Sequence, residues 1–285
     1  MTLARTPALG LGVLTLALAT SARADVTAVQ LGAKVVVAGD STDDVIHVEG
    51  TGALGELRVL EGTSPTEVAS FFGVRDVEIK TGDGNDAVNV SGIEIGGSIK
   101  AKLGAGVDFM RIDDLLADGV TVRATFVGNS LAVALGDQAG DSFECRVQDP
   151  TGSVRFGGGV SVRGGTVVTF DGISSSGDSD PSDIHIGANL VIRSKLTTVV
   201  SLDDINIGGS TSIRLGGSAD FVEIDDAHFT RNFELRMGAG NDAVEFADAV
   251  EFNANALFDG GAGTDSITGS PPTVGGVTVA KNIEG

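Results

Sequence analysis

The chain of 285 residues contains no tryptophan, no tyrosine and a single cysteine, Cys145. One cysteine excludes an intrachain disulfide, so stability outside the cytoplasm would need another source. The missing tryptophan and tyrosine remove the flat rings that many sugar sites use as stacking platforms. Cys145 alternates with Phe143 and Val147, and this pattern predicts a thiol that packs inside the fold rather than one that reacts.

Basic residues are scarce as well. The sequence has 19 Lys and Arg against 39 Asp and Glu, a formal net charge of −20 at pH 7. A surface this acidic opposes nucleic acid and anionic lipid and suits cations, although it could also serve solubility alone. Hydrophobic residues make up 41% of the chain and alternate regularly, which disfavours disorder.

The first 24 residues have the composition of a secretory signal peptide. Arg5 precedes an apolar run from about Ala8 to Ala19, and the small-residue ending Ala22-Arg23-Ala24 follows it. The run is too short for a comfortable membrane span. We expect residues 1–24 to be removed and residues 25–285 to form one domain that is secreted, extracellular or periplasmic, with no membrane span. A disordered or buried N-terminal segment is the alternative.

An aspartate followed by an alternating hydrophobic run recurs at intervals of about 22 residues or near multiples of that length. Thr198 holds the place of the aspartate one period before Asp220, and the register blurs between about residues 129 and 183. The spacing predicts about ten periods. The aspartates of the series are Asp44, Asp86, Asp108, Asp220, Asp242 and Asp265.

Each period contains three short alternating runs separated by three corners. After Asp86 the runs comprise residues 87–90, 93–95 and 99–103, with glycine at the corners. Apolar positions two apart indicate strands rather than a helix. The pattern predicts an all-β, three-sided parallel β-solenoid, or β-helix, with about 22 residues per rung. A β-sandwich is the alternative, but its strands do not recur in identical frames.

Three glycine-aspartate blocks carry a family resemblance. "GGAGTD" at 260–265, "GAGND" at 238–242 and "GDGND" at 82–86 resemble the RTX, or haemolysin-type, calcium-binding nonapeptide G-G-x-G-x-D-x-U-x. The first block matches every specified position, with Ile267 as the apolar residue, whereas Met237 and Thr81 replace the first glycine of the others. The resemblance implies a parallel β-roll that holds calcium between turns through aspartate carboxylates and backbone carbonyls. Here the blocks stand about 22 residues apart rather than nine, so a partner corner would lie one rung away.

Stacked aspartates can serve two purposes. Carboxylates about 5 Å apart repel by roughly 3 kcal/mol at an effective dielectric constant near 20, and calcium would remove that repulsion. Backbone N–H groups could instead satisfy each carboxylate without a metal. Calcium is thus an expected but open cofactor. Its candidate ligands are Asp83, Asp86, Asp108, Asp220, Asp242, Asp259 and Asp265.

Pairs of adjacent aspartates recur at a second corner, as Asp113-Asp114, Asp203-Asp204 and Asp225-Asp226. Their position favours turn formation over surface cation binding. We find no zinc-ligand spacing and no Ser/His/Asp arrangement, so a catalytic role stays open and is not favoured. We expect a secreted acidic solenoid of structural or adhesion type, with an extracellular partner that the sequence does not identify. A polysaccharide-acting β-helix lyase or hydrolase is the alternative, and it rests on fold analogy.

Overall fold

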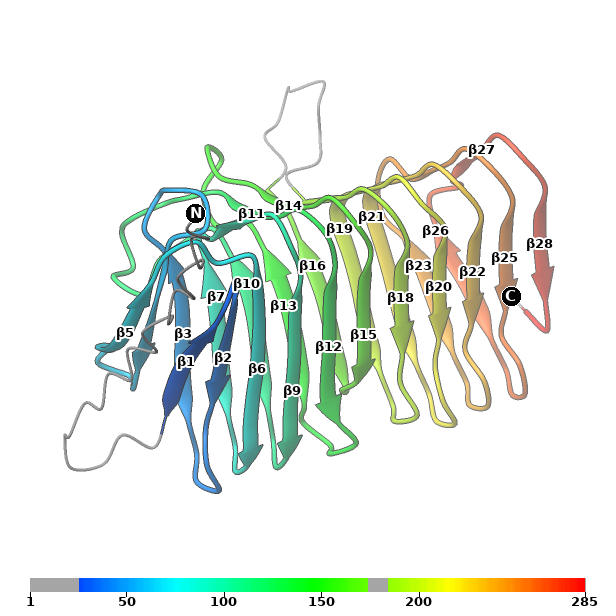
Figure 1. Cartoon of the computed structure of the whole chain (residues 1–285). Coiled ribbons are helices and arrows are strands. Elements are labelled where there is room, and N and C mark those ends of the chain that lie inside the picture. The colour runs from blue at the N-terminus through cyan, green and yellow to red at the C-terminus, as the bar shows by residue number, and fades with distance from the viewer. Residues whose placement is uncertain (1–25, 174–183, 285) are drawn as a thin grey trace, which may run out of the picture.

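The computed structural model describes residues 26–173 and 184–284 of the chain. The predicted signal peptide lies outside these ranges. Within them the protein consists of 28 β-strands and contains no helix. The strands wind into an elongated coil, with the N-terminal strands at one end and the C-terminal strands at the other (Figure 1). No helix in these ranges is long and apolar enough to span a membrane.

Sheet A has 11 strands and forms one long wall of the coil. In spatial order its strands are β1 (Thr27–Leu31), β2 (Lys34–Ala38), β6 (Asp76–Asp83), β9 (Ile99–Ala105), β12 (Leu131–Gly136), β15 (Val160–Gly164), β18 (Leu190–Arg193), β20 (Thr211–Arg214), β22 (Phe233–Arg236), β25 (Ala256–Asp259) and β28 (Thr278–Lys281).

Sheet B has 17 strands. In chain order they are β3 (Val45–Gly50), β4 (Leu57–Glu61), β5 (Thr66–Phe71), β7 (Ala87–Ser91), β8 (Glu94–Ile95), β10 (Phe109–Asp113), β11 (Thr125–Val127), β13 (Ser142–Arg146), β14 (Val154–Phe156), β16 (Val167–Asp171), β17 (Ile184–Ile186), β19 (Val199–Ile207), β21 (Phe221–Phe229), β23 (Ala243–Phe246), β24 (Glu251–Phe252), β26 (Ser266–Gly269) and β27 (Thr273–Val274).

Sheet B is built from two parallel ladders that share strands. One ladder runs β3–β7–β10–β13–β16–β19–β21–β23–β26, and the other runs β8–β11–β14–β17–β19–β21–β24–β27. The ladders merge because β19 and β21 each continue through the corner that elsewhere separates two strands. We call one strand from sheet A and the following one or two strands from sheet B a rung.

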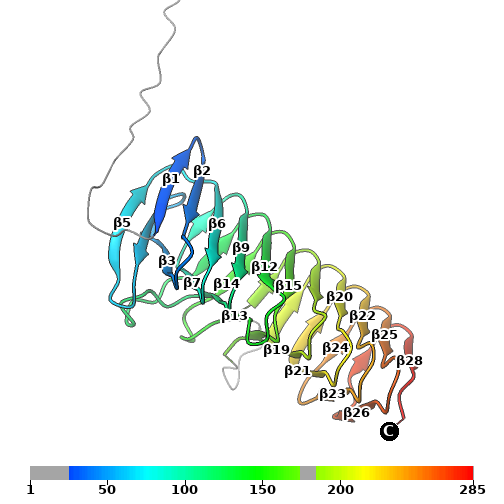
Figure 2. The ribbon, with the colours of Figure 1, turned by 90° about the horizontal axis from the view of Figure 1, so that it is seen from below.

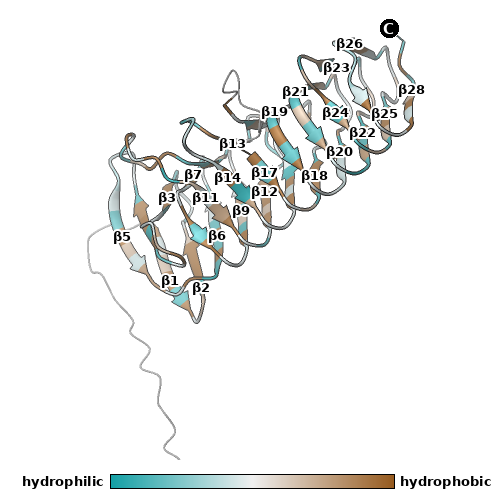
Figure 3. Cartoon of the chain, turned by 90° about the horizontal axis from the view of Figure 1, so that it is seen from above, coloured by the Kyte–Doolittle hydropathy of each residue, from teal (hydrophilic) through white to brown (hydrophobic). Residues whose placement is uncertain are grey.

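The core lies inside the coil and follows from the alternation of side chains along each strand. In β10 the residues alternate between partly exposed and buried positions, and Met110 stacks in register between Val88 and Phe143. The same alternation is visible as bands of hydropathy along the strands in Figure 3. Cys145 is fully buried in this core, as its sequence pattern predicts, and burial raises the pKa of its thiol.

The N-terminal end departs from the repeat. β1 pairs antiparallel with β2, and β3, β4 and β5 form an antiparallel meander, which Figure 2 shows at the end opposite the C-terminus. β3 nevertheless pairs directly with β7. The interval between Asp44 and Asp86 is therefore one rung that contains an inserted meander, and not the two rungs that the 22-residue period predicts.

The middle of the repeat contains two described insertions, and the first of them lies before the range of about residues 129–183 in which the sequence predicts irregular rungs. The connection between β10 and β11 holds residues 114–124, where Leu115 and Val122 form an isolated antiparallel bridge. A shorter excursion at residues 147–153 follows β13. The acidic segment 174–183 lies outside the described residues. Both described insertions leave the parallel pairing of the flanking strands intact.

Candidate functional site: the aspartate corners and an acidic cluster

The residues that immediately precede the first ladder of sheet B form one column along the coil. Their places follow from the register of that ladder, in which the residue after each column position is paired with its equivalent in the next rung. In order, the column consists of Asp44, Asp86, Asp108, Asp141, Thr166, Thr198, Asp220, Asp242 and Asp265. The structure thus places Thr198 where the sequence predicts it.

Each aspartate in the column after Asp44 caps the rung before it. The backbone N–H of Asp86 donates to Oδ1 of Asp108 over 3.0 Å. The N–H of Asp220 donates to Oδ1 of Asp242 over 2.7 Å, and that of Asp242 donates to Oδ1 of Asp265 over 2.9 Å. These bonds satisfy amides that the turn removes from the β-ladder. One oxygen of each of these carboxylates, Oδ1, therefore acts as a backbone cap.

The neighbouring position caps in the opposite direction. Oδ1 of Asn85 accepts from the backbone N–H of Val107 in the next rung over 2.8 Å. Oδ1 of Asn241 likewise accepts from the N–H of Thr264 over 3.0 Å. Consecutive amides at one corner thus bond to the rung before and to the rung after, which fixes the spacing of the stack.

Glycine is required at these corners for two reasons. Gly104 and Gly263 have φ angles of 131° and 142°, a region that residues with a Cβ rarely adopt. A Cβ on Gly104 would also overlap the carbonyl oxygen of Gly82, and one on Gly263 would overlap that of Gly240. The G-x-G-x-D block is therefore explained by a tight corner stacked on an identical corner.

The second carboxylate oxygen, Oδ2, lacks a hydrogen-bond partner in five of the described aspartates of the column. In the described part of the chain, Oδ2 is buried without a hydrogen-bond partner in Asp86, Asp108, Asp220, Asp242 and Asp265. Burial, with the neighbouring charges of Asp86 and Asp141, raises the pKa of Asp108 to about 6. Burial and the charge of Asp242 raise the pKa of Asp220 to about 6, and burial and Asp265 raise that of Asp242. The column therefore holds negative charge that a proton or a cation would neutralise.

The predicted calcium ligands separate into two groups. Asp86, Asp108, Asp220, Asp242 and Asp265 lie in the column, with side chains that are only 1–2% exposed. Asp83 is exposed at the end of β6. Asp259 ends β25, where its Oδ1 accepts from Nδ2 of Asn282 over 2.9 Å. Neither Asp83 nor Asp259 is a member of the column.

Sequence reasoning missed two members of the column, Asp141 and Thr166, of which only Asp141 carries a carboxylate. Its Oδ1 accepts from the N–H of Asp108, and its Oδ2 accepts from the N–H of Gln138, both over 3.0 Å. Asp141 lies 33 residues after Asp108 rather than 22, because the 114–124 connection lengthens this rung. The glycine of "AGDSF" at 139–143 was the signal that could have located it.

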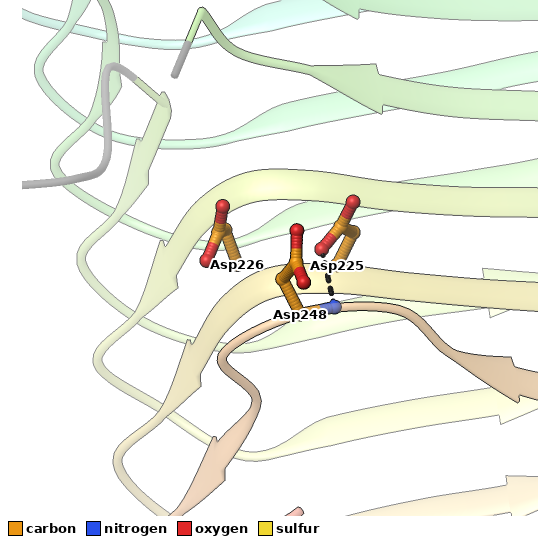
Figure 4. Close-up of side chains that lie close together, drawn as sticks. All are labelled: Asp225, Asp226 and Asp248. Carbon is orange, nitrogen blue, oxygen red and sulfur yellow. Dashed lines mark hydrogen bonds between the residues drawn. The ribbon is translucent and has the colours of Figure 1, made fainter. Parts of the chain in front are cut away.

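A second acidic group lies at the next corner, on β21 and the turn after β23. One ligand atom from each of Asp225, Asp226 and Asp248 falls within 4.8 Å of the others, and the three side chains gather at one place in Figure 4. The N–H of Asp248 donates to Oδ1 of Asp225 over 2.8 Å. Asp226 holds a left-handed backbone with φ of 39°, a conformation that aspartate tolerates better than most residues. We call these three residues the acidic cluster.

The acidic cluster continues along the coil. Asp203 on β19 is in register with Asp225 on β21. Burial and the charges of Asp204, Asp225, Asp171 and Asp226 raise the pKa of Asp203 to about 7. Two of the three predicted aspartate pairs, Asp203-Asp204 and Asp225-Asp226, therefore lie together where β19 and β21 pass through the corner, and they concentrate negative potential that attracts cations.

Comparison of the chain with protein-family models, with curated proteins and with solved structures gave no match. The functional assignment therefore rests on the geometry described above.

Proposed function

We propose that the chain is an exported, acidic β-solenoid of structural or adhesion type, with a three-sided coil. The observation that carries this proposal is the column of amide-to-carboxylate hydrogen bonds from rung to rung. Such a column, together with the parallel ladders, favours a stiff rod with long flat faces for partners. The three strand ladders support three sides, and the composition of residues 1–24 supports export.

We further propose that Ca²⁺ stabilises the rod. Calcium takes six to eight oxygen ligands. The acidic cluster offers three carboxylates beside a fourth, Asp203, on the adjacent strand. Water would complete the shell. The RTX-like corners are the second candidate, because five buried Oδ2 atoms of the column have no hydrogen-bond partner among the described residues, those of Asp86, Asp108, Asp220, Asp242 and Asp265.

The thermal unfolding of the mature protein in millimolar calcium and in excess EGTA tests this function. A ligand that binds only the folded state at about 100 times its Kd stabilises it by about 2.7 kcal/mol. That corresponds to roughly 5–11 °C in a domain of this size. We expect calcium to raise the Tm, and mass spectrometry of the exported protein to show Asp25 as its first residue.

Three variants locate the cation. Asp226→Asn alters the acidic cluster, Asp108→Asn alters the column, and Asp83→Asn is the exposed control. Loss of the calcium effect in Asp226→Asn alone assigns it to the cluster, and loss in Asp108→Asn alone assigns it to the corners. If the melts in calcium and in EGTA coincide for the unaltered protein, calcium stabilisation is wrong and the aspartates act only as caps.

A further inference from the structure

The outer face of sheet A carries a single file of basic side chains. The strands from β6 to β22 lie side by side along one wall of the coil (Figure 1). Because neighbouring strands are about 4.8 Å apart, the file extends over roughly 30 Å. One outward position of each strand is occupied in turn by Lys80, Lys102, Ala134, Arg163, Arg193, Arg214 and Arg236. We call the six basic residues of this file the basic ladder.

The charge of this face differs in sign from that of the whole chain. The strands of sheet A contain nine Lys and Arg against five Asp and Glu, a net charge of +4, whereas the chain has a formal net charge of −20. Sheets that pack face to face lie about 10 Å apart, and the Debye length is about 8 Å at physiological ionic strength. Acidic groups on the outer face of sheet B are therefore largely screened from the basic ladder.

The middle of the basic ladder is exposed and unpaired. Arg163 and Arg193 are exposed, and neither has an ion-pair partner within residues 26–173 and 184–284. Farther along, Glu234 pairs with Arg214 over 3.5 Å and with Arg236 over 2.6 Å, yet the side chains of these two arginines remain 48% and 53% exposed. Like charges one strand apart repel each other. A negatively charged partner would remove this repulsion.

The residues beside the ladder are small and leave the guanidinium groups projecting from a flat floor. The adjacent outward positions of the middle strands are Ala132, Ser161, Val191 and Ser212. A guanidinium presents a planar fork of donors that matches an oxyanion through two hydrogen bonds. A single file of such forks fits an extended chain that carries oxyanions at intervals.

Two other anionic partners fit this face less well. Proteins that bind single-stranded nucleic acid combine a basic groove with aromatic platforms, and the outward positions of sheet A from β6 to β22 hold no aromatic ring. The flat face also has no element that could enter a groove of a duplex. An anionic bilayer presents a plane of charge, whereas the basic ladder is one residue wide.

We propose that the basic ladder binds a linear acidic polysaccharide, laid along the coil with its carboxylate or sulfate groups against Arg163, Arg193 and Arg214. This partner deepens the proposed adhesion role and rests on it for the place where the polymer would be met. The binding itself needs no calcium. It can therefore be measured in EGTA, where its failure is distinguishable from a failure of calcium stabilisation.

The test is calorimetric titration of the purified protein at pH 7 in EGTA. The probes are alginate, which carries carboxylates, and dextran sulfate, which carries sulfates, with uncharged dextran as the polymer control. We expect at least one acidic polymer to bind at about 50 mM NaCl, and the logarithm of its association constant to fall linearly with the logarithm of the salt concentration. Dextran should not bind.

Three variants locate the binding surface. Arg193→Gln should weaken binding about fivefold, the loss of one exposed charge pair at the upper end of the usual range, and Arg193→Glu should weaken it further. Arg155→Gln is the matched control, because Arg155 is an exposed strand residue on β14 of sheet B, and it should bind as the unaltered protein does.

Four results would overturn the proposal. The first is that neither acidic polymer binds at about 50 mM NaCl. The second is that a correctly folded Arg193→Glu binds as tightly as the unaltered protein, and the third is that Arg155→Gln loses as much affinity as Arg193→Gln. The fourth is that single-stranded DNA or phosphatidylserine vesicles bind more tightly than both polymers, which would assign the ladder to a nucleic acid or a membrane.

Discussion

Replacing Asp108 by asparagine separates the capping role of the column from its charge. Asparagine keeps an oxygen that can accept from the N–H of Asp86, the bond that spans 3.0 Å in the structure. It removes a negative charge that lies between Asp86 and Asp141 and is only 1% exposed. If the carboxylate acts only as a cap, its buried charge destabilises the folded state, and the variant should be more stable than the unaltered protein.

The size and sign of the effect follow from the pKa. Because the pKa of Asp108 rises from 3.8 to about 6 on folding, the folded protein binds this proton more tightly than the unfolded chain does. The resulting stabilisation is fully present below pH 3.8 and is lost as the pH rises through about 6. Above that pH the ionised carboxylate of Asp108 contributes about 3 kcal/mol less to the free energy of unfolding than a neutral side chain would. Asp108→Asn should therefore gain up to about 3 kcal/mol at pH 8, and almost nothing at pH 3.5.

Urea unfolding of the two proteins at pH 8 and pH 3.5, in EGTA, measures this difference directly. The exposed residue Asp83 supplies the matched control, since Asp83→Asn should change the free energy of unfolding by less than about 0.5 kcal/mol at either pH. A variant that is less stable than the unaltered protein at pH 8 would refute the reasoning. That result would mean that the folded state uses the charge of Asp108 even when divalent cations have been removed.

Two further substitutions test the corner and the core. Gly104→Ala should destabilise the protein by more than about 3 kcal/mol or prevent folding, because φ is 131° and the new Cβ would overlap the carbonyl of Gly82. Gly96→Ala, where a Cβ meets nothing within 4 Å, should stay close to the unaltered protein in the same thermal melt. Phe252→Ala should cost about 3–5 kcal/mol, because Phe252 is fully buried at the centre of a group of phenylalanine rings. Phe126→Ala, at a ring that is 39% exposed, should cost much less, and equal losses in urea unfolding would contradict the assigned core.

The repeat could be predicted from local signals because each rung carries its own alternation and glycine corners. The antiparallel meander β4–β5 could not, because side chains alternate with a period of two in parallel and antiparallel strands alike. The interval of 42 residues between Asp44 and Asp86 is nearly twice the period, and its length alone suggests a second rung. Only the pairing of β3 with β7 shows that the extra residues leave the ladder and return to it.

The candidate sites, like the fold, could be predicted from the sequence only in part. Spacing alone located most of the column, but it could not show that Oδ1 is already bonded to an amide while Oδ2 is not. That distinction depends on hydrogen-bond direction at the corner.

Corners of the coil are capped both by aspartate and by the asparagine that precedes it, and comparing the two caps helps to explain why the column carries charge. Asn85 and Asn241 show that a side-chain amide bonds a neighbouring rung at these corners without charge. The column nevertheless carries aspartate, and it places like charges on successive rungs. Thr166 and Thr198 interrupt it, so the charges form two separate runs.

Within each run, adjacent carboxylates about one rung apart repel by roughly 3 kcal/mol at an effective dielectric constant near 20. A fold that needed only caps would be more stable with asparagine at these positions. The proposed function accounts for aspartate at these positions if the unpartnered Oδ2 atoms of Asp86, Asp108, Asp220, Asp242 and Asp265 are neutralised, by protons at mildly acidic pH or by a cation such as Ca²⁺. The comparison of Asp108→Asn with the unaltered protein, in EGTA and in calcium, decides between a charge that is merely tolerated and one that is used.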